Sequence, residues 1–266
     1  MKKKLKIFRT IKPFNKTLKM EGDKSISIRW ALLASQAVGK SKSYNLLQSE
    51  DVINTLHCLR KLGVKIKNSK NSCEIVGGGL NSFDYKKNII LDAGNSGTLG
   101  RLIMGLLIHS KSTIKIKGDK SLSKRDFLRV TRPLQKFGAK FKTNSGKLPV
   151  TIYGTDYSKP IKYYEKKGSA QCKSSIMLAA LNTKGKTIIK AKKSRDHTEL
   201  LFKYLNIPIK KKITKNFDLI EINGGQKIKP LNYNIPSDIS SSAFFIVLTA
   251  LSKNSKLTIK DVNINP

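Results

Sequence analysis

An internal repeat is the feature of this sequence that most limits what it can fold into. Four segments begin with small polar residues and continue as an apolar helix: GDKSISIRWALLAS (22–35), GNSGTLGRLIMGLL (94–107), GSAQCKSSIMLAAL (168–181) and PSDISSSAFFIVLTAL (236–251). With Ser25, Ser96, Gln171 and Ile239 taken as equivalent points, the steps are 71, 75 and 68 residues. Steps of this length indicate one large supersecondary unit used several times, and not a solenoid of small repeats.

A second series of helices alternates with the first. Its members are DVINTLHCLRKLGVKI (51–66), FLRVTRPLQKFGAKF (127–141) and HTELLFKYLNIPIKK (197–211). Each is predicted to be an amphipathic helix followed by a turn and a short strand, and strand-forming runs fill the gaps. The unit is therefore two helices plus several strands, used three times between roughly residues 21 and 230, and a fourth copy has begun at the end of the sequence. This pattern predicts an α/β domain with threefold pseudosymmetry. Because no G-x-G-x-x-G motif opens a βαβ unit, a doubly wound dinucleotide-binding fold is disfavoured.

The charge balance is extreme, with 53 Lys and Arg against 17 Asp and Glu and a net charge of +36. Such a balance normally favours nucleic acid as a partner. Here the lysines are dispersed through nearly every segment, and only eight of the 53 basic residues are arginine, the residue preferred for phosphate and base contacts. A compositional bias toward Lys, Ile and Asn explains this pattern better. We therefore predict no nucleic-acid partner, although the positive field attracts small anions.

The sequence gives no sign of a membrane span, a secretory signal or a metal site. No apolar run approaches the ~20 residues that a membrane-spanning helix needs, and no cleavage site follows the basic N-terminus. The three cysteines are odd in number and lack C-x-x-C spacing, so they are predicted to be buried thiols in a cytoplasmic protein. They are Cys58, Cys73 and Cys172.

The starts of the first series of helices are suited to binding anions. A helix N-terminus presents unpaired backbone N–H groups and a partial positive charge, and small residues there let an anion approach. Lys24, Arg29, Arg101 and Arg125 lie at or near these starts. If threefold packing brings the starts together, they form one site for a small, multiply anionic ligand. The alternative is that the Ser, Asp and Asn residues only cap their helices.

Seven blocks, in order from about residue 9 to 266, resemble the signatures of enolpyruvylshikimate-phosphate synthases. The blocks are GDKSISIRWALLASQA, LLQSEDVINTLHCLRKLGV, LDAGNSGTLGRL, GDKSLSKRDFLRVTRPLQKFGA, SAQCKSSIMLAAL, SRDHTELL and IPSDISSSAFFIV. The resemblance implies an enolpyruvyl-transferase fold of two similar domains, each made of three β-α-β-α-β-β units. Residues 1–20 would start the lower domain, 21–230 would form the complete upper domain, and 231–266 would begin the return into a lower domain that is only partly present.

The resemblance also implies the substrate-binding residues. They are Lys24, Ser25, Arg29, Asn95, Gly97, Arg125, Ser169, Gln171 and Ser194. Those near residues 24–29, 169–171 and 194 match contacts to shikimate 3-phosphate. The resemblance implies that Lys24 also faces phosphoenolpyruvate, with a charge or proton-transfer role in catalysis. The residues at 95–97 and 125 match the phosphoenolpyruvate side. In this family the position of Gly97 governs sensitivity to glyphosate, and glycine implies a sensitive enzyme.

Several residues on these blocks have open roles. We expect Asp51 to orient a neighbouring basic residue, and Asp238 to cap a helix, line the site, or both. His197 follows Ser194 closely and either borders the site or is structural, whereas His57 and His109 are expected to be structural. Two positions depart from the family pattern, where proline is usual. They are Glu21 and Asp126, and Asp126 is expected to pair with Arg125 and weaken its hold on phosphoenolpyruvate.

The reaction that the resemblance implies is transfer of the enolpyruvyl group from phosphoenolpyruvate to the 5-hydroxyl of shikimate 3-phosphate, with release of phosphate. It belongs to the shikimate pathway of aromatic amino-acid biosynthesis and uses no metal or other cofactor. In relatives the principal acid–base residues lie beyond the segment matched here, so this chain alone is expected to be inactive, and the full-length protein to be a monomer. The alternatives are a non-catalytic anion-binding domain, the sister transferase acting on UDP-N-acetylglucosamine, and a nucleic-acid binder.

Overall fold

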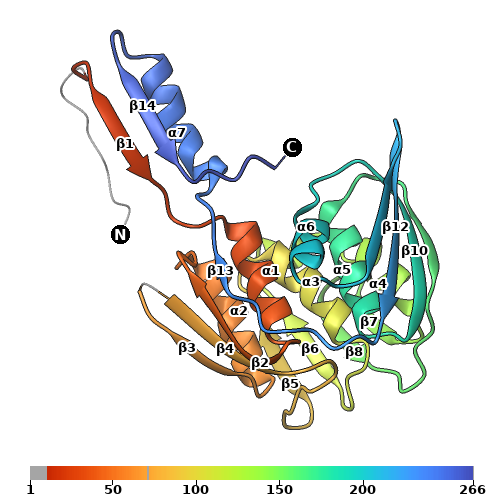
Figure 1. The fold of residues 1–266 in the computed structure, drawn as a ribbon. Coiled ribbons are helices and arrows are strands. Elements are labelled where there is room, and N and C mark those ends of the chain that lie inside the picture. The colour runs from red at the N-terminus through yellow and green to blue at the C-terminus, as the bar shows by residue number, and fades with distance from the viewer. Residues whose placement is uncertain (1–10, 71, 266) are drawn as a thin grey trace.

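The computed structural model describes residues 11–70 and 72–265, and most of them form three similar units (Figure 1). Each unit is built on one four-stranded sheet. The second unit contains β5 (Ile89–Asp92), α3 (Gly97–Leu106), β6 (Ile114–Lys117), the short 3-10 helix η1 (Leu122–Lys124), α4 (Leu128–Gln135), β7 (Lys140–Asn144) and β8 (Lys147–Tyr153). Its strand order is β5-β6-β8-β7, with β5 and β6 parallel and the other pairs antiparallel.

The third unit repeats this arrangement. It contains β9 (Lys162–Glu165), α5 (Ala170–Leu181), β10 (Gly185–Lys192), α6 (His197–Tyr204), β11 (Ile209–Ile213) and β12 (Phe217–Gly224). Its strand order is β9-β10-β12-β11, again with the first pair parallel. Both units therefore have the predicted β-α-β-α-β-β order.

The first unit takes its opening strand from the other end of the chain. It contains α1 (Lys24–Ala34), β2 (Val38–Tyr44), α2 (Glu50–Lys61), β3 (Lys65–Asn68) and β4 (Ser72–Gly78). The parallel neighbour of β2 is β13 (Tyr233–Asn234), which gives the order β13-β2-β4-β3. Trp30 of α1, fully buried, donates its indole N–H to the carbonyl of Leu231 at 3.1 Å and anchors the returning chain.

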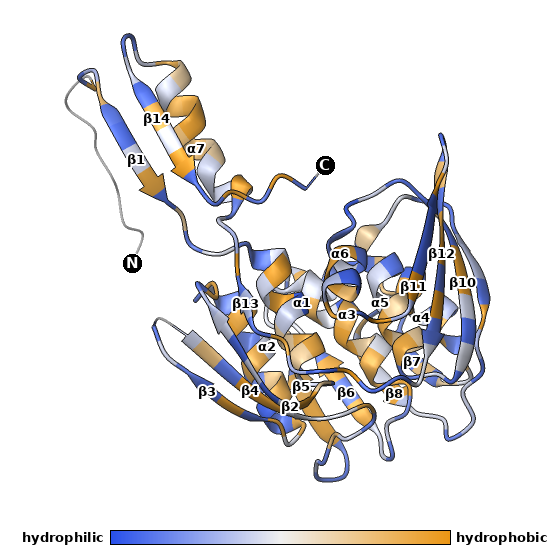
Figure 2. Cartoon of the chain, in the orientation of Figure 1, coloured by the Kyte–Doolittle hydropathy of each residue, from blue (hydrophilic) through white to orange (hydrophobic). Residues whose placement is uncertain are grey.

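Helices α1, α3 and α5 form the centre of this part of the molecule, and α2, α4 and α6 lie further out (Figures 1 and 2). Nearly every residue of α1, α3 and α5 is buried, because these helices are apolar on most sides. Helix α4 buries only one face, as its amphipathic sequence predicts. Gly105 allows close contact between α3 and α5, since a Cβ there would lie 2.1 Å from the carbonyl oxygen of Ser175.

A smaller part of the chain stands apart from the three units (Figure 1). Strand β1 (Asn15–Lys19) pairs in parallel with β14 (Lys256–Lys260), and α7 (Ile239–Ala250) packs beside β14. The predicted domain boundaries, 1–20, 21–230 and 231–266, stay a prediction.

The expectation that the three cysteines are buried thiols is met. Cys58, Cys73 and Cys172 are free and buried. None of the helices in the described ranges is both long and apolar enough to cross a membrane.

Candidate active site

The first part of the candidate site is the start of α1. Asp23 caps this helix, with its Oδ1 accepting from the amide of Ile26 at 2.9 Å. The Lys24 ammonium lies 3.0 Å from Oδ2 of Asp51, and its side chain is about half exposed. Asp51 therefore orients Lys24, as we expected. The amide of Lys24 donates to Oδ2 of Asp238 at 3.1 Å, so the starts of α1 and α7 are joined.

Arg29 is buried one turn further along α1 and connects three helices. Its Nε donates to the hydroxyl of Thr198 at 2.9 Å, and its Nη2 donates to the hydroxyl of Ser174 at 3.2 Å. Its Nη1 donates to the carbonyl of Ser25 at 3.0 Å. All three acceptors are neutral. Burial lowers the pKa of Arg29 to about 10, and the negative charge of Glu199 opposes this shift.

Arg101 holds the equivalent place on α3, although the family resemblance did not lead us to include it among the nine site residues. Its Nη1 donates to Oε1 of Gln171 at 2.7 Å, and Gln171 in turn donates to the hydroxyl of Thr98 at 3.0 Å. Burial lowers the pKa of Arg101 to about 10, with further lowering by the charges of Arg129 and Arg125. A signal was present in the sequence, since Arg101 lies four residues after the helix start at 97 and Arg29 lies five residues after that at 24.

The loop before α3 brings Asn95, Gly97 and Arg125 together. A Cβ on Gly97 would lie 2.8 Å from Nη1 of Arg101 and 3.3 Å from Nη1 of Arg125, so both guanidinium groups face the backbone of Gly97. The side-chain amide of Asn95 donates to Oδ2 of Asp119. Oδ1 of Asp119 accepts from the backbone amide of Leu122 at 2.6 Å. These two hydrogen bonds lower the pKa of Asp119 and fix the loop that carries Arg125.

Two of the predicted serines lie at neighbouring loops. Ser169 caps α5, with its hydroxyl accepting from the amide of Cys172 at 3.3 Å, and Glu165 accepts from the amide of Ser169 at 2.9 Å. The hydroxyl of Ser194 is buried and has no hydrogen-bond partner among the described residues. It lines a hollow with Asp196 and Lys211, an ion pair of 3.0 Å.

His197, which begins α6, is buried near Arg29. Its Nε2 lies 3.0 Å from the amide nitrogen of Asn263, which also donates to Asp23 at 3.0 Å. Burial lowers the pKa of His197 to about 4, helped by the charge of Arg29, so the imidazole is neutral at pH 7. Asn263 had no sequence signal, because only the fold brings residue 263 to the starts of α1 and α6.

The remaining predicted side chains have structural partners. Asp238 caps α7 by accepting from the amides of Ser240 and Ser241 at 2.7 and 3.2 Å, so its role as a cap is confirmed. The predicted pairing of Asp126 with Arg125 is wrong, because among the described residues they form no ion pair. The Asp126 carboxylate instead accepts from the amide of Leu128 at 2.8 Å, at the start of α4. Glu21 is exposed, and its carbonyl accepts from the amide of Asp238.

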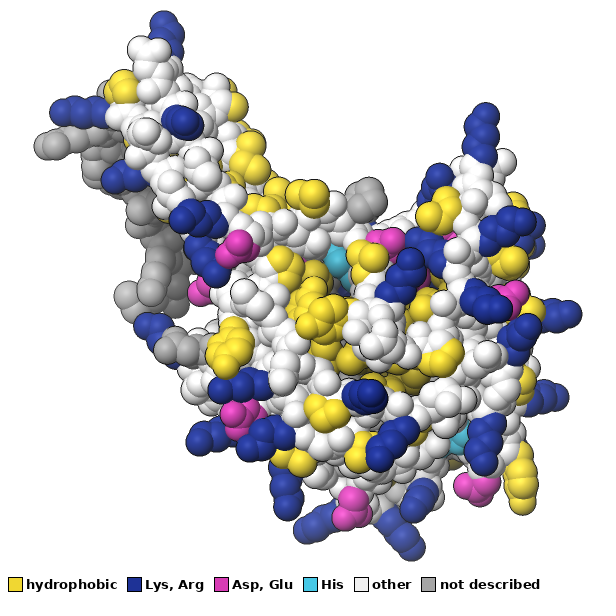
Figure 3. All heavy atoms as spheres, in the orientation of Figure 1, with side chains coloured by type: hydrophobic (Ala, Val, Ile, Leu, Met, Phe, Trp, Pro, Cys, Tyr) yellow, Lys and Arg dark blue, Asp and Glu magenta, His cyan; other side chains and the backbone are white. Residues whose placement is uncertain are grey.

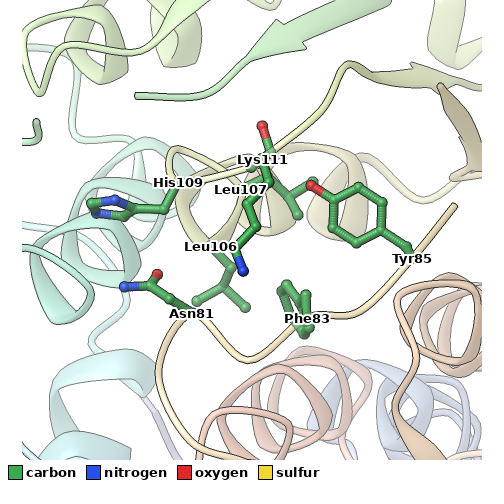
Figure 4. Close-up of a pocket in the computed structure, with 8 residues that line it drawn as sticks. Asn81, Phe83, Tyr85, Leu106, Leu107, His109 and Lys111 are labelled. Carbon is green, nitrogen blue, oxygen red and sulfur yellow. The ribbon is translucent and has the colours of Figure 1, made fainter. Parts of the chain in front are cut away.

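His109 is far from these groups in the fold, since it follows the C-terminal end of α3. It lines a small hollow with Tyr85 and Leu107 (Figure 4). The volume of this hollow is about 20 Å³, enough for a single water molecule. The expectation that His109 is structural therefore fits its position.

The charges of the site are unevenly balanced. All nine ion pairs between described side chains use lysine, and none uses an arginine. Arg29, Arg101 and Arg125 therefore keep their positive charges without a carboxylate in contact. Figure 3 shows a concave surface between the smaller part of the chain and the main body, with basic, acidic and histidine side chains along it. Three guanidinium groups without a contacting carboxylate are suited to a ligand with several negative charges.

Comparison with known proteins identifies the family. The sequence model of the EPSP synthase family, described as 3-phosphoshikimate 1-carboxyvinyltransferase, matches residues 8–266. The chain belongs to the EPSP synthase family. It is 42% identical over 251 residues to the 3-phosphoshikimate 1-carboxyvinyltransferase of Vesicomyosocius okutanii, and 41% identical over 256 residues to that of Streptococcus mutans. These alignments cover 94% of this chain but only 56% and 58% of the two relatives.

A solved structure gives the same result for the fold. EPSP synthase from Acinetobacter baumannii superposes with a TM-score of 0.87 at 36% identity, over 96% of this chain and 57% of that chain. The predicted enolpyruvyl-transferase fold is thus confirmed. The chain spans less than two thirds of the length of the curated relatives that it matches.

Proposed function

We propose that this site binds shikimate 3-phosphate and phosphoenolpyruvate, and that the whole protein transfers the enolpyruvyl group between them. The observation that carries the proposal is the pair of buried guanidinium groups, Arg29 and Arg101, at the starts of neighbouring helices. Each is held by neutral acceptors alone. Two desolvated cations without a contacting carboxylate favour a multiply anionic ligand, and membership of the EPSP synthase family favours this pair of substrates.

The proposed placement follows the two sides of the site. Shikimate 3-phosphate would lie against Ser25 and Arg29 on one side and against Ser169, Gln171 and Ser194 on the other. Phosphoenolpyruvate would lie over Gly97, where the missing side chain leaves room beside Arg101 and Arg125. Lys24 and Asn95 would complete the phosphoenolpyruvate side.

The chemistry needs charge stabilisation and proton transfer. The 5-hydroxyl loses its proton and its oxygen forms a bond to C2 of phosphoenolpyruvate while C3 gains a proton. The tetrahedral intermediate then loses phosphate from C2 and a proton from C3 to leave the enolpyruvyl ether. Lys24 and the arginines would stabilise the phosphate and carboxylate charges. Among the groups of the described site, Lys24, held by Asp51, would take part in proton transfer.

We infer that this 266-residue chain alone binds shikimate 3-phosphate without turnover. Four carboxylates of the site are already engaged: Asp51 in an ion pair, Asp23 and Asp238 in capping hydrogen bonds, and Asp119 in hydrogen bonds from Asn95 and Leu122. None is free to act as the general base for the 5-hydroxyl. A non-catalytic anion-binding domain remains the alternative function, and the same engaged carboxylates favour it.

We further propose a cytoplasmic location, supported by the three free, buried thiols, and a monomer for the full-length protein.

Calorimetric titration of the chain tests the proposal. Shikimate 3-phosphate should bind about tenfold or more tightly than shikimate or inorganic phosphate alone, because each charge-assisted hydrogen bond contributes roughly 1.5–3 kcal/mol. Equal affinity for shikimate 3-phosphate and phosphate would contradict the substrate assignment. With a longer chain that restores the length of the relatives, phosphate release should require shikimate 3-phosphate and not occur with UDP-N-acetylglucosamine. Binding without release in that longer chain would favour the non-catalytic alternative.

A further inference from the structure

A second basic groove lies beside the candidate active site, between α4 and the chain that follows β9. Its lining includes five basic side chains and two tyrosines, and it shares no residue with the nine predicted for the active site. These seven residues are Arg129, Arg132, Lys136, Tyr163, Tyr164, Lys166 and Lys167. Its volume is about 490 Å³, large enough for a small organic or polyphosphate anion.

The arginines in this groove are not explained by the lysine-rich composition of the chain. Only eight of the 266 residues are arginine, and three of them, at positions 125, 129 and 132, fall within eight residues. Arg129, Arg132 and Lys136 are spaced three and four apart from α4 onward, so they lie on one face and line the same groove. Arginine is the side chain that binds phosphate with two parallel hydrogen bonds.

The five cations have no contacting carboxylate among the described residues. None of the nine ion pairs in the described part of the chain involves them. The two acidic residues of the groove are occupied by backbone amides: Asp126 accepts from Leu128, and Glu165 accepts from Lys167 and Ser169. The groove therefore keeps a surplus of positive charge. Nε of Arg129 is buried and has no hydrogen-bond partner in the part of the chain that the structure describes.

The walls of the groove are held in place by a hydrogen bond and by cation–π contacts, and none of these neutralises the five cations. The thiol of Cys172 donates to the carbonyl of Arg129 at 2.9 Å and so ties α4 to α5. Across the groove, the ammonium of Lys136 lies 5.7 Å from the ring centre of Tyr163. On the β9 side, the ammonium of Lys166 lies 5.8 Å from the ring centre of Tyr164. The tyrosine rings thus position lysine ammonium groups at the groove without neutralising them.

We propose that the groove between α4 and β9 is a second binding site, for a small molecule that carries two or more phosphate groups. The guanidinium groups of Arg129 and Arg132 bind one phosphate, and the ammonium groups of Lys136, Lys166 and Lys167 bind the next. The site lies directly behind the loop that carries Arg125 and beside the loop that carries Ser169, because Asp126 and Lys167 line it. The proposal does not depend on the identity of the active-site substrates.

Pyrophosphate is the probe for the test, titrated into the 266-residue chain by calorimetry at fixed ionic strength. The double variant R129Q/R132Q should weaken its binding by about tenfold or more, because two charge-assisted contacts are lost. Two further double variants remove the same charge elsewhere. K140Q/K142Q changes exposed lysines of β7 and should alter pyrophosphate affinity by less than about threefold. K24Q/R125Q changes the candidate active site, which itself attracts anions, and should leave in place the binding event that R129Q/R132Q weakens.

The outcomes separate a built site from a diffuse field. Equal weakening by R129Q/R132Q and K140Q/K142Q would overturn the proposal, because net charge alone would then explain binding. Loss of binding only in K24Q/R125Q would also overturn it, by assigning pyrophosphate to the active site. R129K/R132K keeps the charge and removes the planar fork, and partial weakening by this variant would support phosphate binding by the two guanidinium groups. Thermal unfolding of each variant controls for folding.

Discussion

At the scale of single residues, the site is defined by buried arginines whose partners are neutral. Burial lowers the pKa of both Arg29 and Arg101 to about 10, yet both remain protonated at pH 7. The sequence predicts Arg29, Gly97 and Gln171 as site residues, because they lie on recognisable blocks. It does not predict the bond from Arg101 to Gln171, since residues 70 positions apart meet only through the packing of α3 on α5. The error at Asp126 has a similar cause: the sequence does not show that a nearby amide would take its carboxylate.

A methyl group at Gly97 tests the proposed phosphoenolpyruvate pocket. In Gly97→Ala the new Cβ would lie 2.8 Å from Nη1 of Arg101, which Gln171 holds in place. We expect phosphoenolpyruvate affinity, measured by calorimetry with shikimate 3-phosphate present, to fall by about tenfold, since a charge-assisted contact contributes roughly 1.5–3 kcal/mol. Gly100→Ala is the matched control, because its Cβ meets only ordinary contacts at 3.5 Å. Equal loss in both variants would mean that helix α3, and not the pocket, is disturbed.

His197 should make the folded state sensitive to acid. Its pKa is lowered to about 4 by burial and by Arg29, whereas an unfolded histidine has a pKa near 6.5. The unfolded chain therefore binds the proton first, so this contribution to stability is complete above pH 6.5 and is lost as the pH falls toward 4. We expect about 2 kcal/mol of the free energy of unfolding to disappear between pH 7 and 5.

The measurement for His197 is urea unfolding at several pH values. His197→Gln should flatten the decline between pH 7 and 5, whereas His57→Gln should leave it unchanged because His57 is exposed on α2. His109, whose pKa is also lowered by burial, adds a smaller slope of the same sign in both variants. An unaltered decline in His197→Gln would show that other groups cause the acid sensitivity.

At the scale of elements, periodicity predicts most helices and strands, and local chemistry sets their starts. Asp23, Ser96, Ser169 and Asp238 each accept a backbone hydrogen bond at the start of a helix of the first series. Strand β13 could not be predicted, because Tyr233–Asn234 is two residues long and its pairing with β2 comes from the far end of the chain. The sequence also does not predict the buried ion pair between Lys173 of α5 and Glu199 of α6, because nothing in it shows that these two residues meet in the core.

Lys173 and Glu199 form a buried ion pair of 2.6 Å between α5 and α6, with 1% and 2% of the side chains exposed. Glu199→Gln leaves the ammonium unpaired in the core and should lower the free energy of unfolding by about 3–5 kcal/mol. The double variant K173M/E199L should recover most of this loss, because no buried charge remains. Glu74→Gln is the control, since Glu74 pairs with Lys40 at 3.8 Å on the surface and should cost less than about 1 kcal/mol. Urea unfolding measures all three; a small loss in Glu199→Gln would mean that Lys173 is neutral or hydrated.

At the scale of the whole molecule, the chain passes through three units and then returns to the first of them. The first unit receives β13 where the others have β5 and β9, so the predicted threefold pattern is completed by a strand from the far end of the described chain. Closure brings the starts of α1, α3 and α5 to one side, and this arrangement makes a shared anion site possible. The net charge of +36 then acts on the site as a long-range field.

The exposed apolar surface of helix α7 determines how the chain behaves in solution. Helix α7 is apolar on nearly every side but buries only Ser242 among its residues, and Phe244 and Leu251 are each 81% exposed. Such a helix is normally covered, so we expect the 266-residue chain to self-associate through α7. The net charge opposes this association, and salt should therefore increase it by screening the repulsion.

Sedimentation velocity at low and high salt measures the effect. F244S/L251S should abolish the salt-induced association, whereas Y157S/L200S, which removes exposed apolar side chains of the main body, should not. Equal association in both variants would assign it to some other surface.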